Sequence, residues 1–289
     1  MNWEETKAFL SPCFPQPIRE EMELLLPGEL REIRVRAGRS TVFCTATRVV
    51  ALDWQPDQRQ VEALAEALSD HSLYARAQET SQGYVTLRGG HRMGLCGRVT
   101  HQGLKDIGSI CVRIAGQWPG CAEGLLPHAE NLLIIGPPAS GKTTLLRDLA
   151  RLLSSGRQGR QVAMIDERGE LAACVHGVPQ LDVGESCDVL DGCSKPDAVR
   201  WLIRSMSPQA IITDELSGAE DAAALLDAMA CGASVIASCH GTNLSEVANR
   251  PAMAGLMARR AFHHYALLHP EGGGRVAALY DRSGSPITL

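Results

Sequence analysis

Aromatic residues are scarce in this chain, at 4% of its 289 residues. The core must therefore be built mainly from Leu, Val, Ile and Ala side chains. The ten cysteines include no Cys-x-x-Cys pair, which argues against a zinc ribbon. Buried free thiols behave as small apolar groups, so we expect a reducing compartment and no framework of disulfides.

Long apolar runs and an excess of positive charge are also missing. No stretch approaches the roughly 20 apolar residues that a membrane helix needs, and no basic segment followed by an apolar run indicates a signal peptide. We therefore expect a soluble, cytoplasmic protein that docks on a membrane only through a partner. The formal net charge of −5 argues against a protein that coats nucleic acid, because such proteins usually carry a basic surface.

Two regions of different pattern divide the chain. Residues 1–120 contain short helical and strand patterns separated by prolines and glycines, which indicates a small α+β domain. Residues 121–289 alternate apolar strands with helices, which is typical of an α/β domain whose parallel sheet is covered on both faces. In this second domain the predicted strands are 131–135, 161–165, 210–213, 233–238, 262–268 and 275–280, and the predicted helices are 144–153, 196–206 and 218–230. The last two strands are joined across a run of three glycines and predict a hairpin.

The clearest chemical signal is the segment GPPASGKT, residues 136–143, which has the phosphate-loop (P-loop) pattern Gly-x-x-x-x-Gly-Lys-Thr. Its glycines let backbone N–H groups face a phosphate, and the helix that follows adds the positive end of its dipole. Lys142 is expected to contact the β- and γ-phosphates, and Thr143 to bind Mg²⁺. We therefore expect ATP and Mg²⁺ as cofactors. The predicted nucleotide-binding residues are Gly136, Pro137, Pro138, Ala139, Ser140, Gly141, Lys142, Thr143 and Thr144.

Two acidic residues, Asp214 and Glu215, follow the predicted strand 210–213. In nucleotide-binding α/β folds the strand ends line the ligand crevice. We expect Asp214 to join Thr143 in binding Mg²⁺, and Glu215 to act as the general base that polarises the attacking water. The alternative is an acidic turn after a core strand, which the presence of a P-loop disfavours.

The predicted strand 233–238 leads into the sequence Cys-His-Gly, residues 239–241. In RecA-like sheets this strand lies between the P-loop strand and the strand of the acidic pair, so its end faces the γ-phosphate. His240 is therefore a candidate for sensing or stabilising that phosphate. The alternative is a structural histidine at a strand end.

A third group, Asp166 and Glu167, opens the segment Asp-Glu-Arg-Gly-Glu after the predicted strand 161–165. These acids suit either of two roles. They are candidate catalytic residues that position water or metal, and they equally fit a solvated turn at the start of a helix.

The order and spacing of these motifs resemble the secretion-ATPase superfamily, which powers type II and type IV secretion and pilus motors. The segments 89–98, 177–184, 188–192 and 202–208 resemble, more narrowly, one family within it that acts in endospore formation. The resemblance covers nearly the whole chain. It implies a RecA-like P-loop ATPase domain preceded by a smaller N-terminal domain, and a homohexameric ring in the mother-cell cytoplasm. It also implies that the partners are membrane proteins of the mother cell-to-forespore channel.

In such motors, arginines of the N-terminal domain meet the nucleotide. The matching candidates here are Arg92, Arg98 and Arg113. An arginine binds two phosphate oxygens at once, and one supplied late stabilises transition-state charge. The alternative for each is a surface salt bridge. Pilus motors often keep only the Glu of the acidic pair, whereas both acids are present here.

Two other functions fit part of the sequence. The strip 88–98 has four basic residues and no acid, which suits an ATPase that remodels nucleic acid. The low content of aromatic residues for base stacking disfavours that interpretation. An inactive nucleotide-dependent scaffold is the other alternative, and the intact Lys142, Thr143 and Glu215 argue against it.

Overall fold

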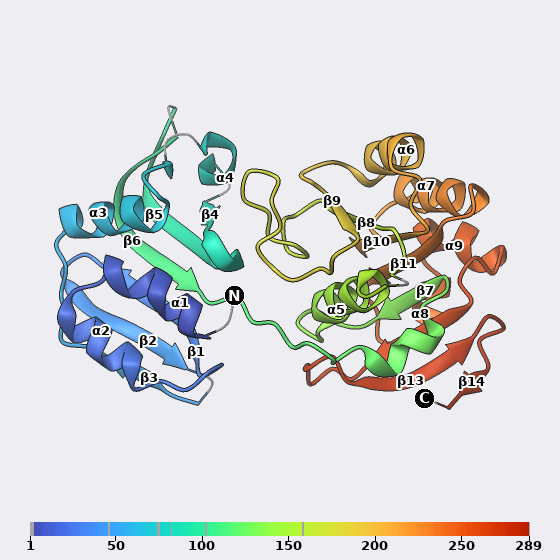
Figure 1. The fold of residues 1–289 in the computed structure, drawn as a ribbon, viewed down its shortest axis with the longest axis horizontal. Helices are drawn as coiled ribbons and strands as arrows, with labels where there is room; N and C mark the ends of the chain where they lie inside the picture. Colours follow the sequence, from blue (N-terminus) through green and yellow to red (C-terminus); the bar gives the residue numbers. More distant parts are fainter. Residues whose placement is uncertain are drawn as a thin grey trace. The chain divides into compact units, whose positions relative to one another are not determined.

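The computed structural model describes residues 3–45, 47–73, 76–81, 83–101, 103–157 and 159–288. The chain forms two compact units (Figure 1). Unit 1 comprises Met1–Gly116 together with Ala173–Leu181, and unit 2 comprises Gln117–Ala172 together with Asp182–Leu289. The predicted division at residues 120 and 121 is a single cut, whereas the observed division also gives the short segment 173–181 to unit 1.

Unit 1 is built on an antiparallel sheet with the strand order β3-β2-β1-β6-β5-β4. Its strands are β1 (Leu30–Arg36), β2 (Arg39–Thr45), β3 (Val49–Ala51), β4 (Tyr84–Thr86), β5 (Arg92–Thr100) and β6 (Gly103–Arg113). Its helices are α1 (Trp3–Leu10), α2 (Gln16–Glu23), α3 (Gln58–Leu68) and α4 (Ala77–Ser81), with single turns η1 (Ser11–Cys13) and η3 (Arg88–Gly90).

The core of unit 1 lies on one face of this sheet. In β1, Ile33 and Val35 are buried while the intervening Arg34 is not, as alternation predicts for a half-covered strand. The buried strand residues form one cluster with apolar residues of α1, α2 and α3. Helix α3 begins after Asp57, whose side chain accepts a hydrogen bond from the Gln60 N–H in a capping box.

The segment 173–181 joins unit 1 through close contacts between its side chains and the backbone of η3. The Gly89 N–H donates to Gln180 Oε1 at 3.1 Å. A Cβ at Gly90 would lie 2.7 Å from Leu181 Cδ2, so the two residues pack closely. These contacts are between residues about ninety positions apart, which explains why no local sequence pattern predicted them.

Unit 2 is built on an eight-stranded sheet with the order β14-β13-β12-β7-β11-β10-β8-β9. Its strands are β7 (Leu132–Ile135), β8 (Val162–Asp166), β9 (Cys187–Asp191), β10 (Ala210–Glu215), β11 (Ser234–Cys239), β12 (His264–Leu268), β13 (Val276–Asp281) and β14 (Pro286–Ile287). Its helices are α5 (Lys142–Ser154), α6 (Lys195–Ser205), α7 (Ala219–Ala230), α8 (Leu244–Ala248) and α9 (Pro251–Ala258), with the turn η4 (Glu123–His128).

Six neighbouring strands of this sheet, from β12 to β9, are parallel. Every residue of β7, β8 and β11 is buried, as expected for strands covered on both faces. Strand β11 lies between β7 and β10, which confirms the strand order expected for a RecA-like sheet. The carboxyl ends of these strands therefore meet at one edge.

Several elements of unit 2 differ from the prediction. The hairpin of β12 and β13 is present as expected, but β9, α8, α9 and β14 were not predicted. Strand β9 is amphipathic at the sheet edge and has only five residues, so its pattern is weak. The edge strands are β14 and β9.

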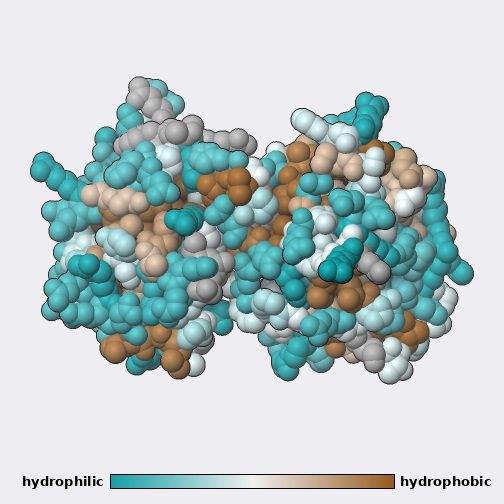
Figure 2. Space-filling view, viewed as in Figure 1, coloured by the Kyte–Doolittle hydropathy of each residue, from teal (hydrophilic) through white to brown (hydrophobic). Residues whose placement is uncertain are grey.

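Most of the surface seen in Figure 2 is hydrophilic, with small apolar patches. The large exposed apolar side chains belong to Leu24, Leu26, Val49, Val99, Trp118, Leu126, Val178, Trp201 and Met206. Among the described helices, none combines the length and apolar character needed to cross a membrane.

Candidate active site

The candidate site lies at the carboxyl edge of the parallel strands in unit 2, where the P-loop connects β7 to α5. The loop residues Ala139 and Gly141 have positive φ, at 60° and 100°. Helix α5 begins at Lys142, and the first N–H groups of a helix have no partner inside it. The loop and helix therefore offer backbone donors for a phosphate, as the sequence motif predicts.

Lys142 is buried within the loop. Its Nζ donates to Gly136 O and Pro137 O, both at 2.8 Å, and lies 3.3 Å from His240 Nδ1. Burial lowers the pKa of this ammonium, and Glu215 opposes the shift. To contact a phosphate, Lys142 must exchange the two carbonyl oxygens for phosphate oxygens, which are stronger, charged acceptors.

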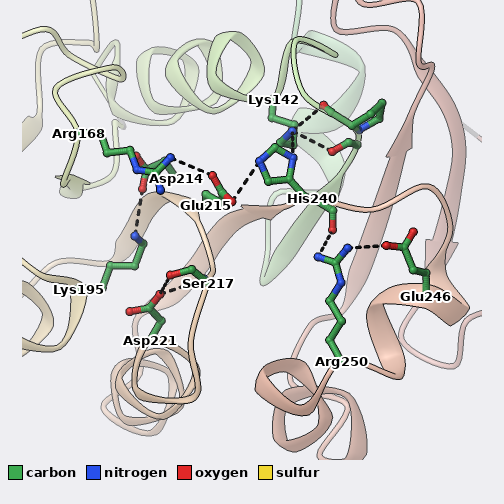
Figure 3. A network of polar contacts seen from close by, with 12 residues as sticks. Lys142, Arg168, Lys195, Asp214, Glu215, Ser217, Asp221, His240, Glu246 and Arg250 are labelled. Carbon is green, nitrogen blue, oxygen red and sulfur yellow. Dashed lines mark hydrogen bonds and ion pairs between the residues drawn. The ribbon is translucent and has the colours of Figure 1, made fainter.

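Glu215 and His240 connect Lys142 to Arg168 (Figure 3). His240 Nε2 lies 3.1 Å from Glu215 Oε1, and Arg168 Nη1 lies 3.2 Å from Glu215 Oε2. The Lys142 ammonium can only donate, so His240 Nδ1 accepts and its Nε2–H donates to Glu215. The structure thus brings together Lys142 at the start of α5 with Glu215 and His240 at the ends of β10 and β11, three residues for which the sequence predicts roles.

Asp214 and Glu167 share a cation that the sequence did not reveal. The Lys195 Nζ lies 2.6 Å from Glu167 Oε2 and 3.2 Å from Asp214 Oδ1. The Lys195 side chain is 3% exposed. Burial raises the pKa of Asp214 to about 6, although Lys195 pulls it down. Lys195 is thus the counter-ion of the acid expected to bind Mg²⁺.

Asp166 holds the loop that follows β8. Its carboxylate accepts the N–H groups of Glu170, Leu171 and Ala172 at 2.8, 3.1 and 2.8 Å. Arg147 on α5 donates to the carbonyl oxygens of residues 170 and 171. These bonds give Asp166 a structural role in the loop, because both its oxygens already have donors. The expected solvated turn at a helix start is wrong, since Asp166 is 0% exposed and no helix follows it in the described chain before α6. A direct role in chemistry stays a prediction.

Mg²⁺ fits the residue set only as part of a nucleotide complex. Thr143 supplies a hydroxyl and Asp214 a carboxylate, and Mg²⁺ commonly uses one or two carboxylates with phosphate oxygens and water. Across the described ranges, no group of three or more His, Cys, Asp or Glu residues could hold a metal ion by itself. The phosphates would therefore have to complete the metal's shell.

Arg250 is a further residue that the sequence analysis missed. Its Nη1 donates to His240 O at 2.6 Å, and its Nη2 pairs with Glu246 at 2.5 Å. Hydrogen bonds from Thr242 and Arg250 lower the pKa of Glu246 to about 2. This arrangement fixes the backbone of His240. Neither Arg250 nor Lys195 belongs to a short motif, so only their place in the fold reveals them.

The three candidate arginines lie in unit 1 and have local partners. Arg92 stacks over the Tyr84 ring at 3.8 Å. Arg98 pairs with Asp106 at 2.6 Å, and Arg113 pairs with Glu32 at 3.3 Å. The structure therefore shows the local pairing that was the alternative for Arg98 and Arg113, and their role at a nucleotide stays a prediction.

This chain is similar in sequence to known proteins. Residues 15–287 match the family described as "Sporulation stage III, protein AA". A relative from Bacillus subtilis (strain 168), stage III sporulation protein AA, is 42% identical over 274 residues, covering 90% of this chain and 89% of the relative. The Arabidopsis thaliana protein SEEDLING PLASTID DEVELOPMENT 1 is 25% identical over 86% of this chain and 35% of its own length.

Solved structures show the same fold. The Legionella pneumophila ATPase DotB superposes with a TM-score of 0.60 at 15% identity, covering 88% of this chain and 76% of DotB. The pilus retraction motor PilT with bound ADP gives a TM-score of 0.60 at 15% identity, covering 86% of this chain and 76% of PilT. The predicted RecA-like P-loop fold of the secretion ATPases is confirmed.

Proposed function

The chain belongs to the Sporulation stage III, protein AA family, and from this premise we propose that it is a Mg²⁺-dependent ATPase. It energises or assembles the mother cell-to-forespore channel during endospore formation. The observation that carries the enzymatic part is the chain of contacts from Lys142 through His240 and Glu215 to Arg168 beside the P-loop. A pure scaffold has no need of a carboxylate held in this way.

Each residue has a distinct role in the proposed reaction. The P-loop N–H groups and Lys142 bind the β- and γ-phosphates, while Thr143 and Asp214 hold Mg²⁺. When bound, the metal neutralises charge on the phosphate oxygens. Glu215 orients the attacking water and accepts its proton, and its bonds to His240 and Arg168 fix the carboxylate before substrate arrives.

His240 links this base to the phosphate site. In the unliganded arrangement its Nδ1 faces Lys142 Nζ at 3.3 Å. When Lys142 moves to the γ-phosphate, that nitrogen loses its donor. The imidazole is then available to reorient with the phosphate, which suits the predicted role of sensing the nucleotide state.

The proposed active form is a homohexameric ring with membrane proteins of the channel as partners. In that ring Arg92, Arg98 or Arg113 of one subunit stabilises charge at a neighbouring subunit's nucleotide. The exposed side chains of Arg98 and Arg113, at 69% and 65%, support this proposal because they can exchange Asp106 and Glu32 for phosphate oxygens.

The test is ATP hydrolysis by the purified protein with and without Mg²⁺. Lys142→Ala should abolish ATP binding. Glu215→Gln should still bind ATP but lose turnover by about 100-fold or more, the usual scale for a general base. Glu130→Gln is a matched control, because Glu130 also pairs with an arginine, Arg160, at 3.2 Å outside the site.

Three results would count against the proposal. Wild-type turnover in Glu215→Gln would remove the assigned base. A protein that stays monomeric at high concentration with ATP would remove the arginines' role in a neighbouring site. Strong stimulation of hydrolysis by DNA or RNA at physiological salt would favour nucleic-acid remodelling instead.

A further inference from the structure

The hairpin of β12 and β13 brings a run of three glycines against the P-loop. Strand β12 pairs in parallel with β7, with Leu267 opposite Ile135. Because parallel strands end at the same edge, the hairpin turn and the P-loop leave the sheet side by side. The turn residues Gly272, Gly273 and Gly274 have φ values of 84°, 78° and 68°, a conformation that favours glycine.

Two backbone segments touch here with almost no space between them. The Gly274 N–H donates to Ser140 O at 2.9 Å. A Cβ at Gly141 would lie 2.4 Å from Gly274 N, and a Cβ at Gly272 would lie 3.1 Å from Ala139 O. The turn therefore borders three consecutive residues of the P-loop, Ala139 to Gly141, through their main chain.

These contacts set the orientation of a peptide group in the phosphate loop. The C=O and N–H of a trans peptide point in opposite directions. The bond from Gly274 to Ser140 O therefore turns the Gly141 N–H away from the hairpin. Ala139 is held at φ 60°, a strained conformation for a non-glycine residue that needs support from its surroundings.

We propose that the turn Gly272–Gly274 is a positioning element for the P-loop, which sets the affinity of the site for the phosphates of the nucleotide. The inference rests on the proposed ATPase function. In it, the turn forms one wall of the phosphate site, although it lies about 130 residues beyond the motif, from positions 141 to 274. It concerns binding of the phosphates, and not recognition of the base or the catalytic step.

The chain offers a matched pair of variants to test this. Gly272→Ala and Gly273→Ala introduce the same side chain at nearly the same positive φ, 84° and 78°, so the backbone strain is alike. A Cβ at Gly273 has no atom within 4 Å, whereas one at Gly272 meets Ala139 O at 3.1 Å. Only Gly272→Ala should therefore displace the P-loop.

The experiment measures Kd for ATP, pyrophosphate and adenosine, each in the presence of Mg²⁺, together with the Tm of each unliganded protein. Gly272→Ala should bind ATP and pyrophosphate about fivefold more weakly than Gly273→Ala, the scale of one lost hydrogen bond. Adenosine, which lacks phosphates, should bind the two variants equally. The unliganded Tm values should agree.

The other outcomes overturn the proposal. Equal phosphate binding by the two variants removes the positioning role while leaving the proposed ATPase intact. Equal weakening for adenosine and pyrophosphate indicates a general structural defect, as does a lower unliganded Tm for Gly272→Ala alone. If the wild-type protein binds neither ATP nor pyrophosphate, the proposed function fails and this inference fails with it.

Discussion

The two units arrange their charged side chains in different ways. In unit 1 the arginines pair locally and near the surface, as Arg98 does with Asp106 and Arg113 with Glu32. In unit 2 the charged residues at the strand ends form connected groups, in which Glu215 bonds to both Arg168 and His240. Unit 1 also has a shared carboxylate, Glu32, but its two arginine partners, Arg34 and Arg113, are 38% and 65% exposed, whereas the shared Lys195 of unit 2 is 3% exposed.

The sheets explain this difference. An antiparallel sheet with one covered face leaves the other face open to solvent, so charged pairs across its neighbouring strands, such as Arg113 with Glu32, stay near the surface. A parallel sheet needs crossover helices, so its strand ends collect residues from distant parts of the chain at one buried edge. Charge substitutions at the strand ends of unit 2 should therefore act on stability and function together, while those in unit 1 should act weakly on stability.

The largest effect on stability is expected for the buried lysine of unit 2. Lys195→Met leaves Asp214 buried without its counter-ion and should lower the free energy of unfolding by about 3 kcal/mol. Lys7→Met is the matched substitution in unit 1, because Lys7 also bridges two acids, Glu4 and Glu23, at 3.2 and 2.8 Å. Those acids are 78% and 60% exposed, so Lys7→Met should lower the free energy of unfolding far less than Lys195→Met does. Urea denaturation of both variants measures the two free energies of unfolding. Equal losses in the two variants would show that the two units do not differ in this way.

A smaller, pH-dependent effect is expected in unit 1, at its buried histidine. His91 is 1% exposed and accepts the Ala115 N–H at Nδ1. Burial lowers its pKa to about 4. Between about pH 6.5 and pH 4 the unfolded chain binds the proton and the folded chain does not, so stability falls as pH falls. From pH 7 to pH 5 the loss should be about 2 kcal/mol.

His91→Gln retains an acceptor for the Ala115 N–H but cannot titrate in this range. Its stability should therefore change less between pH 7 and pH 5 than that of the wild-type protein. Hydrogen exchange of β5 and β6 at the two pH values reports on unit 1 alone. Equal acid sensitivity in the variant and the wild type would show that another group causes the loss.

The smallest effects on stability are expected for the exposed arginines. Arg98→Ala and Arg113→Ala should each change the free energy of unfolding by less than about 1 kcal/mol, because exposed ion pairs contribute little. Thermal denaturation at low and high salt is the measurement. A loss as large as that of Lys195→Met would show that unit 1 also depends on its charge pairs, and the contrast between the units would disappear.

Sequence patterns predicted most of unit 2 because its signals are local. The P-loop motif, the buried strands β8, β10 and β11, and the helices between them each occupy one continuous segment. The prediction that β11 lies between β7 and β10 is confirmed because RecA-like sheets share one strand order. The acids and the histidine at the strand ends could then be expected to gather.

The features that the sequence did not predict depend on contacts between residues far apart in the chain, which no local pattern encodes. Lys195 follows a helix cap formed by Ser194, and nothing nearby in sequence shows that its side chain reaches Asp214. Likewise, the segment 173–181 packs in unit 1 through Gly90 and Leu181, which are far apart in the chain. Asp166 had two interpretations from sequence, and its three backbone donors became visible only in the folded loop.

The two edges of the unit 2 sheet limit how copies of this chain can associate. One edge is β14, which has two residues and begins with Pro286, and proline lacks the N–H that a pairing strand requires. The other edge is β9, which carries Asp188 and Asp191, and charge along an edge strand opposes pairing with a second strand. Joining two such sheets into one continuous sheet is therefore disfavoured. Any ring that these subunits form would be held by side chains on other surfaces, which can separate and re-form during a cycle without breaking a shared sheet.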